Sequence, residues 1–325
     1  MLVRIEKDWA DPDLRRQTPG GTGCWGDLEI TFDPVRECDL LLVLNSPNRD
    51  IRVRCPVGNR WLFSQESPVD MYRWHRDSFR HFDRVFTFWD DVSDAVVVHE
   101  QTALPWHVGR TYDELHAQTL DEARGYKRDA VSWVTSSATH KPGHKLRMAF
   151  KDHLVSQRFP FDLFGRGFEP IADKFDGLYP YKYSFAIENH GCNDYWTEKI
   201  ADCFLSWTMP IYWGAPNILD YFPAEAMILV DPADPEAALA TVRAALAADR
   251  WQQHAAALGE ARRRVLERYQ LFPHLQQLVD RYAAASDQQR CSVFIPANAA
   301  HFGPQSPLQR MSLSLKRGVR RVLGV

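Results

Sequence analysis

The sequence lacks several features that would assign it to a specialised class of protein. Its six cysteines form no Cys-X-X-Cys pair and no zinc-type spacing with histidine, so neither a disulfide framework nor a zinc site is predicted. The formal net charge of −3 gives no broad basic field, and no nucleic-acid partner is expected. No apolar stretch approaches the ~18 residues of a membrane-spanning helix, and the N-terminus contains no signal-peptide pattern. These absences favour a cytoplasmic protein.

What the sequence contains is typical of a soluble α/β protein. Its 325 residues exceed what one hydrophobic core usually serves, and 45% of them are hydrophobic. In the second half, short apolar runs alternate with amphipathic stretches, which predicts a parallel, doubly wound sheet. We expect an N-terminal α/β domain at 1–120, a C-terminal Rossmann-like domain at 121–290 and a tail at 291–325. A ligand would bind in the cleft between the domains, outside the carboxyl ends of the strands.

The expected elements follow from the hydrophobic periodicity. Each strand is a short apolar run, and each helix carries an apolar stripe with a period of three to four residues. The glycine cluster at 20–23 is interpreted as a turn. Strands are predicted at 39–45, 61–63, 84–89, 95–98, 130–135, 161–164, 183–187, 209–213 and 226–230, and helices at 142–157, 194–207, 235–268 (with a break near Leu258–Gly259) and 274–285.

The helix predicted at 194–207 carries the most distinctive polar pattern. Tyr195, Glu198 and Lys199 are spaced three and four residues apart and share one face of its first turns. A helix N-terminus that follows a buried strand binds phosphate through free N–H groups and the helix dipole. Lys199 adds a positive charge, and Glu198 is suited to ribose hydroxyls. The face therefore suits a nucleoside diphosphate, although a solvated face with a Glu–Lys ion pair has the same spacing.

The tail at 306–325 differs from the rest of the chain. It contains five basic residues and no acidic residue, and its apolar residues recur every three or four positions. This pattern predicts a helix that contacts an anionic membrane surface peripherally. A terminal helix packed on its own domain, or a disordered tail, would have the same composition.

Five segments together resemble glycosyltransferase family 10, the α-1,3/1,4-fucosyltransferases, in its bacterial form. The segments are Tyr181–Asn189, Asp194–Ile200, Met209–Gly214, Tyr221–Pro223 and Val230–Asp231. The resemblance implies a GT-B fold, with two facing Rossmann-like domains and GDP-fucose as the donor substrate, held mainly by the C-terminal domain. It implies no further cofactor and no essential metal, and the sequence has no strand-anchored Asp-X-Asp of the metal-dependent kind.

The resemblance also assigns donor-binding residues. Arg147 matches the family arginine that contacts the diphosphate, and its fork-shaped guanidinium suits two phosphate oxygens. Without the resemblance, Arg147 would equally be an exposed helix arginine. Ser136 and Ser137 end the preceding strand and could donate hydroxyls to phosphate, or simply form a turn. The full set of expected donor-binding residues is Arg147, Tyr195, Glu198, Lys199, Glu188, Asn189, Ser136 and Ser137.

One short segment in the N-terminal half resembles the family's Glu-Ser-Pro sequence. Glu66 follows the strand at 61–63, and the resemblance implies that it is the general base. Transfer with inversion needs one carboxylate to take the proton of the acceptor hydroxyl. A solvated turn glutamate before proline is the alternative interpretation.

The expected function is therefore inverting transfer of L-fucose from GDP-fucose to a hydroxyl of a glycan or glycolipid acceptor, of the surface-polysaccharide or lipopolysaccharide type. Two alternatives stay open at this stage. One is a transferase of the same fold that uses a different nucleotide sugar. The other is a nucleotide-sugar-binding protein without transfer activity.

Overall fold

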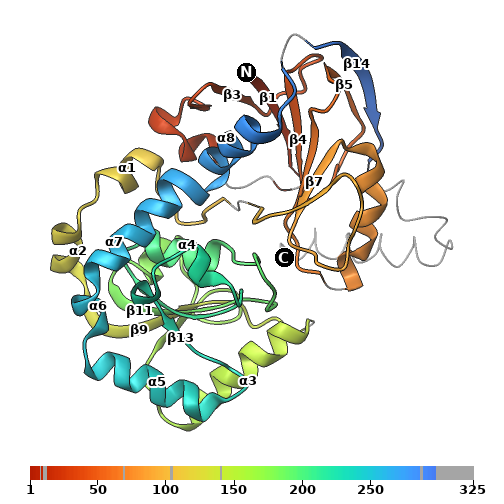
Figure 1. Cartoon of the computed structure of the whole chain (residues 1–325). Coiled ribbons are helices and arrows are strands. Elements are labelled where there is room, and N and C mark those ends of the chain that lie inside the picture. The colour runs from red at the N-terminus through yellow and green to blue at the C-terminus, as the bar shows by residue number, and fades with distance from the viewer. Residues whose placement is uncertain are drawn as a thin grey trace.

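The protein consists of two α/β units, each built around its own sheet (Figure 1). The structure is a computed structural model and describes residues 1–7, 9, 13–68, 70–102, 105–139, 141–285 and 288–297, with backbone alone for 70–74. The tail at 306–325, for which a membrane-surface helix is predicted, lies outside the described residues. Among the residues described, no helix combines the length and apolar character needed to span a bilayer.

The first unit is organised around a seven-stranded sheet in which all neighbours are parallel except β2 and β3. Its central strand β4 is apolar throughout because both faces of the sheet are covered. Leu40, Leu42 and Leu44 belong to one core, and Leu41 and Val43 belong to the other. Across the sheet, the strands are β2 (Cys24–Trp25), β3 (Leu28–Thr31), β1 (Leu2–Glu6), β4 (Leu40–Leu44), β6 (Arg60–Ser64), β7 (Arg84–Thr87) and β8 (Val97–His99).

Segments from the end of the described chain complete this first unit. Helix α8 (Leu271–Tyr282) contributes Leu271, Leu275 and Leu278 to the core on one face. Strand β14 (Arg290–Ile295) pairs antiparallel with β5 (Ile51–Pro56) over the other face, where the 3-10 helix η3 (Asp70–His81) also packs. Figure 1 shows α8 and β14 lying beside strands from the N-terminal part of the chain.

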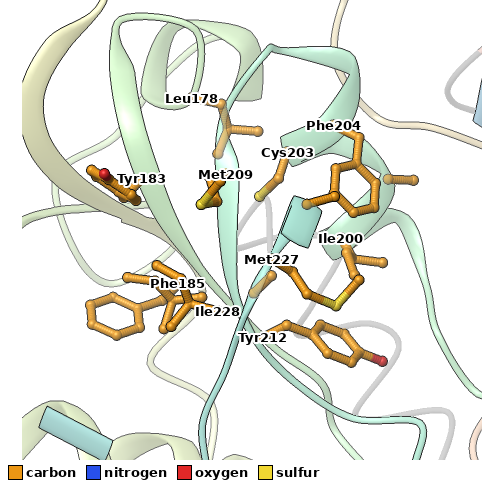
Figure 2. Packing of buried hydrophobic residues seen from close by; sticks show 14 of the residues in the cluster. Leu178, Tyr183, Phe185, Ile200, Cys203, Phe204, Met209, Tyr212, Met227 and Ile228 are labelled. Atoms are coloured by element: carbon orange, nitrogen blue, oxygen red, sulfur yellow. The ribbon is translucent and has the colours of Figure 1, made fainter. Parts of the chain in front are cut away.

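The second unit contains a five-stranded, fully parallel sheet. Helix α4 (Glu198–Leu205) packs on it through Ile200, Cys203 and Phe204, which lie among strand side chains such as Met209 and Ile228 (Figure 2). In order, the strands are β10 (Asp162–Phe164), β9 (Arg128–Val134), β11 (Tyr181–Ile187), β12 (Met209–Trp213) and β13 (Ile228–Leu229). Parallel order with intervening helices is the arrangement that the alternating sequence pattern predicts.

The remaining helices of the described chain belong mostly to the second unit. The α-helices are α1 (Tyr112–Ala117), α2 (Leu120–Tyr126), α3 (Pro142–Ser156), α5 (Pro235–Ala247), α6 (Arg250–Gln253) and α7 (Ala255–Arg264), which continues as the π-helical turn η7 (Val265–Tyr269). Short 3-10 turns are η1 (Leu14–Gln17), η2 (Pro19–Gly21), η4 (Lys174–Gly177), η5 (Ile218–Asp220) and η6 (Ala224–Ala226).

The predicted break near Leu258–Gly259 is wrong. The helical region instead turns at Asp249, which has a left-handed φ of 43° and caps α6 through its side chain. Gly259 lies inside α7, where a Cβ atom would come within 3.4 Å of the Trp207 ring. The glycine thus serves close helix packing, not chain reversal.

The packing also divides the chain differently from the expected limits at residues 120 and 290. Trp106 and Leu115, expected in the first domain, lie in the core of the second. Helix α8, expected in the second domain, covers the sheet of the first. The periodicity of α8 identifies its apolar face but carries no information about which sheet that face meets.

Candidate active site

A continuous cleft lies where both sheets end at their carboxyl edges. It comprises a larger cavity of about 860 Å³ on the side of the second unit and a smaller one of about 340 Å³ toward the first. The two cavities share the residues His107, Asn189, Glu198 and Lys199. This is the place expected for a ligand in a protein built from parallel α/β sheets.

The loop between β11 and α4 differs from the predicted helix start at Asp194. Asp194 has a left-handed φ of 63°, and its carboxylate accepts hydrogen bonds from Asn217 (2.7 Å) and Tyr221 (2.5 Å) instead of capping a helix. Thr197 is the N-cap, and the helix begins at Glu198. Tyr195 therefore precedes the helix, so the prediction that it shares a helical face with Glu198 is wrong.

Tyr195 nevertheless reaches the predicted site. It lines the smaller cavity, and its ring packs on Phe88 of the first unit with centroids 4.8 Å apart. Burial, together with the nearby Glu188 carboxylate, raises the pKa of the phenol well above its usual range. The side chain is thus a neutral hydrogen-bonding group on the seam between the two units.

Glu188 is fully buried and binds groups at the N-terminus of α4. Its carboxylate accepts hydrogen bonds from the backbone N–H and the hydroxyl of Thr197, both at 2.8 Å, and from Nζ of Lys199 at 3.0 Å. Burial raises its pKa even though the Lys199 ammonium opposes this. Glu188 was expected to bind the donor directly, but it does not line either cavity; the structure makes it the support of Lys199.

Glu198 and Lys199 both face the cleft. Burial alone would raise the pKa of Glu198, but the ammonium groups of Lys199 (3.7 Å) and Lys174 (3.5 Å) outweigh it and hold that pKa well below its usual range. Burial would lower the pKa of Lys199, but Glu188 and Glu198 raise it. Both groups are therefore charged near neutral pH, as the site prediction requires.

Lys174 and His107 line the larger cavity and were not predicted from the sequence. Lys174 Nζ lies 3.1 Å from the buried Asp202 carboxylate, which also accepts the His107 backbone N–H at 2.8 Å. Asp202 is four residues after Glu198, one helical turn along α4. That spacing was a usable signal for Asp202, but nothing local in the sequence brings Lys174 to the same helix.

Arg147 lies on α3 and lines the larger cavity, as predicted. It is 3% exposed, and its Nη1 donates to the Asn189 side chain at 2.8 Å. Its Nε has no hydrogen-bond partner among the described residues. Helix α3 approaches closely because of Gly143, where a Cβ atom would lie 1.9 Å from the Asn189 carbonyl oxygen. Burial lowers the pKa of Arg147, with the Glu188 carboxylate opposing this; a buried guanidinium with an unused donor suits an anionic ligand.

Of the two serines predicted to bind the donor, one lines the larger cavity and the other does not. Ser136 lines the larger cavity at the end of β9. Ser137 is exposed, and its Oγ occupies the space beside Gly167, where a Cβ atom would meet it at 2.1 Å. Ser137 is not among the residues that line the cavity, so its expected donor contact is not supported. Both serines lie in the loop after β9, which ends at Val134, and of the two it is Ser136 that faces the cavity.

Glu66 stands across the cleft, just after β6, and lines the smaller cavity. Its backbone carbonyl accepts the Trp89 indole N–H at 2.7 Å, which fixes the loop. Its side chain is 35% exposed, and Oε2 lies 3.9 Å from Nζ of Lys141 in the second unit. Within the described part of the chain, no group of three or more His, Cys, Asp and Glu side chains is arranged to hold a metal ion.

Comparison with known families identifies the segment that forms one side of this cleft. Residues 125–254 match the model for glycosyltransferase family 10 (fucosyltransferase), C-terminal domain. The chain carries a family 10 glycosyltransferase domain. The matched residues contain Arg147, Asn189, Glu198 and Lys199, so these residues of the larger cavity lie within the family 10 domain.

Individual relatives agree with this assignment. Over 124 residues the chain is 33% identical to an α-(1,3)-fucosyltransferase of Helicobacter pylori, covering 37% of this chain and 25% of that protein. Over 76 residues it is 37% identical to a GDP-fucose protein O-fucosyltransferase 3 of Danio rerio, covering 23% of this chain and 17% of the relative. The aligned part thus spans a quarter or less of these relatives.

The predicted GT-B fold is confirmed over most of the chain. A solved α1,3-fucosyltransferase superimposes with a TM-score of 0.51 at 17% identity, covering 88% of this chain and 90% of that one. This likeness extends beyond the family 10 domain and includes the first unit, where sequence resemblance is thin.

Proposed function

We propose that the protein transfers L-fucose from GDP-fucose to a hydroxyl of a glycan acceptor, with inversion at the sugar carbon. The observation that carries this proposal is the arrangement of charge across one cleft. Arg147, Lys174 and Lys199 line the larger cavity from the family 10 domain, and the Glu66 carboxylate lines the smaller cavity from the other unit. A polyanionic donor and a hydroxyl acceptor would meet between them.

The charged residues that line the larger cavity support a nucleoside diphosphate sugar as its ligand. The diphosphate would lie against Arg147 and Lys199, and the N–H groups at the start of α4 would add partial positive charge. Glu198 is ionised and accepts hydrogen bonds, so it suits the ribose hydroxyls, which are donors. GDP-fucose is the donor proposed because the Danio rerio relative is named for that substrate.

The proposed reaction uses Glu66 as its general base. Its carboxylate takes the proton of the acceptor hydroxyl while that oxygen forms a bond to C1 of fucose from the face opposite GDP. The bond from C1 to the β-phosphate oxygen breaks at the same time, and GDP leaves with the electron pair. The cations of Arg147 and Lys199 stabilise the charge that GDP gains, so no second carboxylate is needed to protonate the leaving group.

Glycans of the surface-polysaccharide or lipopolysaccharide type are the acceptors that we propose. The smaller cavity supports a sugar because it combines the indole of Trp9 with polar side chains from Asn45 and Gln65. An aromatic ring beside amide groups suits the apolar face and the hydroxyls of a pyranose. The linkage formed would depend on which hydroxyl reaches Glu66.

Calorimetry with the purified chain tests the donor first. We expect GDP-fucose to bind more tightly than GDP-mannose, UDP-galactose or GDP alone, and the fucosylated product formed with a glycan acceptor to have the inverted anomeric configuration by NMR. Tighter binding of another nucleotide sugar would replace fucose in the proposal. Tight binding of GDP-fucose with neither transfer nor slow hydrolysis would identify a binding protein instead of an enzyme.

A further inference from the structure

Lys141 occupies a helix-capping position at which lysine is unfavourable. It is the N-cap of α3, and its side chain makes no capping hydrogen bond. Ser, Thr, Asp and Asn are preferred at this position, and the positive end of the helix dipole repels an ammonium group. Lys141 is also only 7% exposed, although lysine is rarely buried. Residues that break local preferences in this way are commonly placed for function.

The ammonium group of Lys141 lies near a carboxylate of the other unit of the protein. Its Nζ lies 3.9 Å from Oε2 of Glu66, so the ion pair crosses the cleft. The same helix carries Arg147 six residues later, in the larger cavity. Helix α3 therefore contacts the expected base at its start and the expected diphosphate site in its second turn.

We propose that Lys141 is a positioning residue for Glu66. Its ammonium group attracts the Glu66 carboxylate and keeps it turned into the smaller cavity, and it ties the position of that carboxylate to the helix that holds Arg147. This inference rests on the proposed function, because it assigns Lys141 to the base of that reaction.

The distance between the two groups suits this role. At 3.9 Å, the ammonium is beyond the 2.7–3.2 Å range of a hydrogen bond, so it acts on the carboxylate through its charge. The oxygen lone pairs stay available for the proton of an acceptor hydroxyl. A closer, hydrogen-bonded lysine would occupy one of those lone pairs and weaken the base.

Other charged groups surround the Lys141–Glu66 pair. Burial lowers the pKa of Lys141, Glu66 raises it, and the cations of Lys199 and Arg147 lower it further. Toward Glu66, the smaller cavity also presents His107, Glu198, Lys199 and the neutral phenol of Tyr195. Glu198 and Lys199 are themselves paired, whereas the Lys141 ammonium lies 3.9 Å from the Glu66 carboxylate.

The direct test is a titration of the Glu66 carboxyl carbon by NMR in protein labelled with ¹³C-glutamate. The signal is identified by its loss in Glu66→Gln. We expect Lys141→Met to move its titration midpoint upward by about 0.5 pH unit, because a neighbouring positive charge has been removed. Lys141→Arg should restore most of the shift. The matched control is Lys145→Met, an exposed lysine on the same helix, which should leave the midpoint in place.

Kinetics separate positioning from donor binding. We expect Lys141→Met to lower kcat about tenfold and to move the acid limb of the pH–rate profile toward higher pH, while the Kd for GDP changes less than twofold. An unmoved midpoint, or a GDP affinity that falls by the same factor as kcat, would overturn the positioning role. In the second case Lys141 would be a diphosphate ligand.

A failure of the proposed function would look different. Full transfer by Glu66→Gln would remove Glu66 as the base, and the positioning role with it, even if the Lys141 variants shift the titration. An unmoved midpoint in a protein that is inactivated by Glu66→Gln would overturn the Lys141 proposal alone.

Discussion

The two sides of the cleft hold their charged groups in opposite ways. On the family 10 side, Glu188, Lys199 and Glu198 interact with one another, and their side chains are at most 20% exposed. On the other side, the Glu66 side chain is 35% exposed and has a cross-cleft ion pair at 3.9 Å. The difference matches the proposed roles. The proposed donor side is preorganised because its charges neutralise one another, whereas the proposed base must remain accessible to the hydroxyl that it would deprotonate.

The largest expected effect comes from the accessible side. Glu66→Gln keeps the size of the side chain but cannot accept a proton, so we expect turnover to fall by ~10²–10⁴. GDP affinity measured by calorimetry should stay within twofold of the parent, because Glu66 does not line the larger cavity. Unchanged turnover would remove Glu66 from the mechanism, and the greater exposure of Glu66 would then have no catalytic explanation.

Glu188→Gln probes the preorganised side. The change removes the buried carboxylate that holds Lys199 and Thr197, and breaking such a pair typically costs about 3–5 kcal/mol. We expect the free energy of unfolding in urea to fall by roughly that amount. Glu260→Gln on α7 is the matched control, because Glu260 pairs with Arg263 and Arg264 at the surface and should cost at most about 1 kcal/mol. Equal costs for the two variants would show that the buried network is not a special source of stability.

Arg147→Ala has the smallest expected effect and concerns binding. Loss of a charge-assisted hydrogen bond should weaken GDP binding by roughly 1.5–3 kcal/mol in calorimetry. Arg243→Ala, an exposed position on α5, should leave the affinity unchanged. Equal GDP affinity in Arg147→Ala and the parent would mean that the cations of α4 hold the diphosphate without α3.

The features that the sequence predicted correctly are those determined by local patterns along the chain. The parallel sheet of the second unit and the cleft were predictable because strands such as Tyr181–Ile187 and helices such as Pro142–Ser156 have strong local periodicity. Lys199, Glu198 and Arg147 were predictable because they lie within segments that resemble family 10. For these three residues, the chemistry of the side chain and its place in a family segment both indicated donor binding.

The remaining features depend on contacts between distant residues. Tyr195 was placed on a helix because the predicted helix began at Asp194. The side chain of Asp194 is instead held by Asn217 and Tyr221, which lie more than twenty positions after it, and Thr197 caps the helix. Glu188 was assigned to the donor because a family segment does not show which way a side chain points. Lys141 has no sequence signal, since its partner Glu66 lies 75 positions earlier in another unit.

The return of the chain to its first unit has a consequence for synthesis. The face formed by Trp61, Phe63 and Phe86 is covered by α8, and β5 forms its two-stranded sheet with β14, so both partners emerge from the ribosome after the second unit. Until residues more than 180 positions away have been made, the first sheet has an exposed apolar face and β5 lacks its partner strand, which is the situation in which chains aggregate or recruit chaperones. The first unit is thus begun first and finished last, while the second unit can close as it is made.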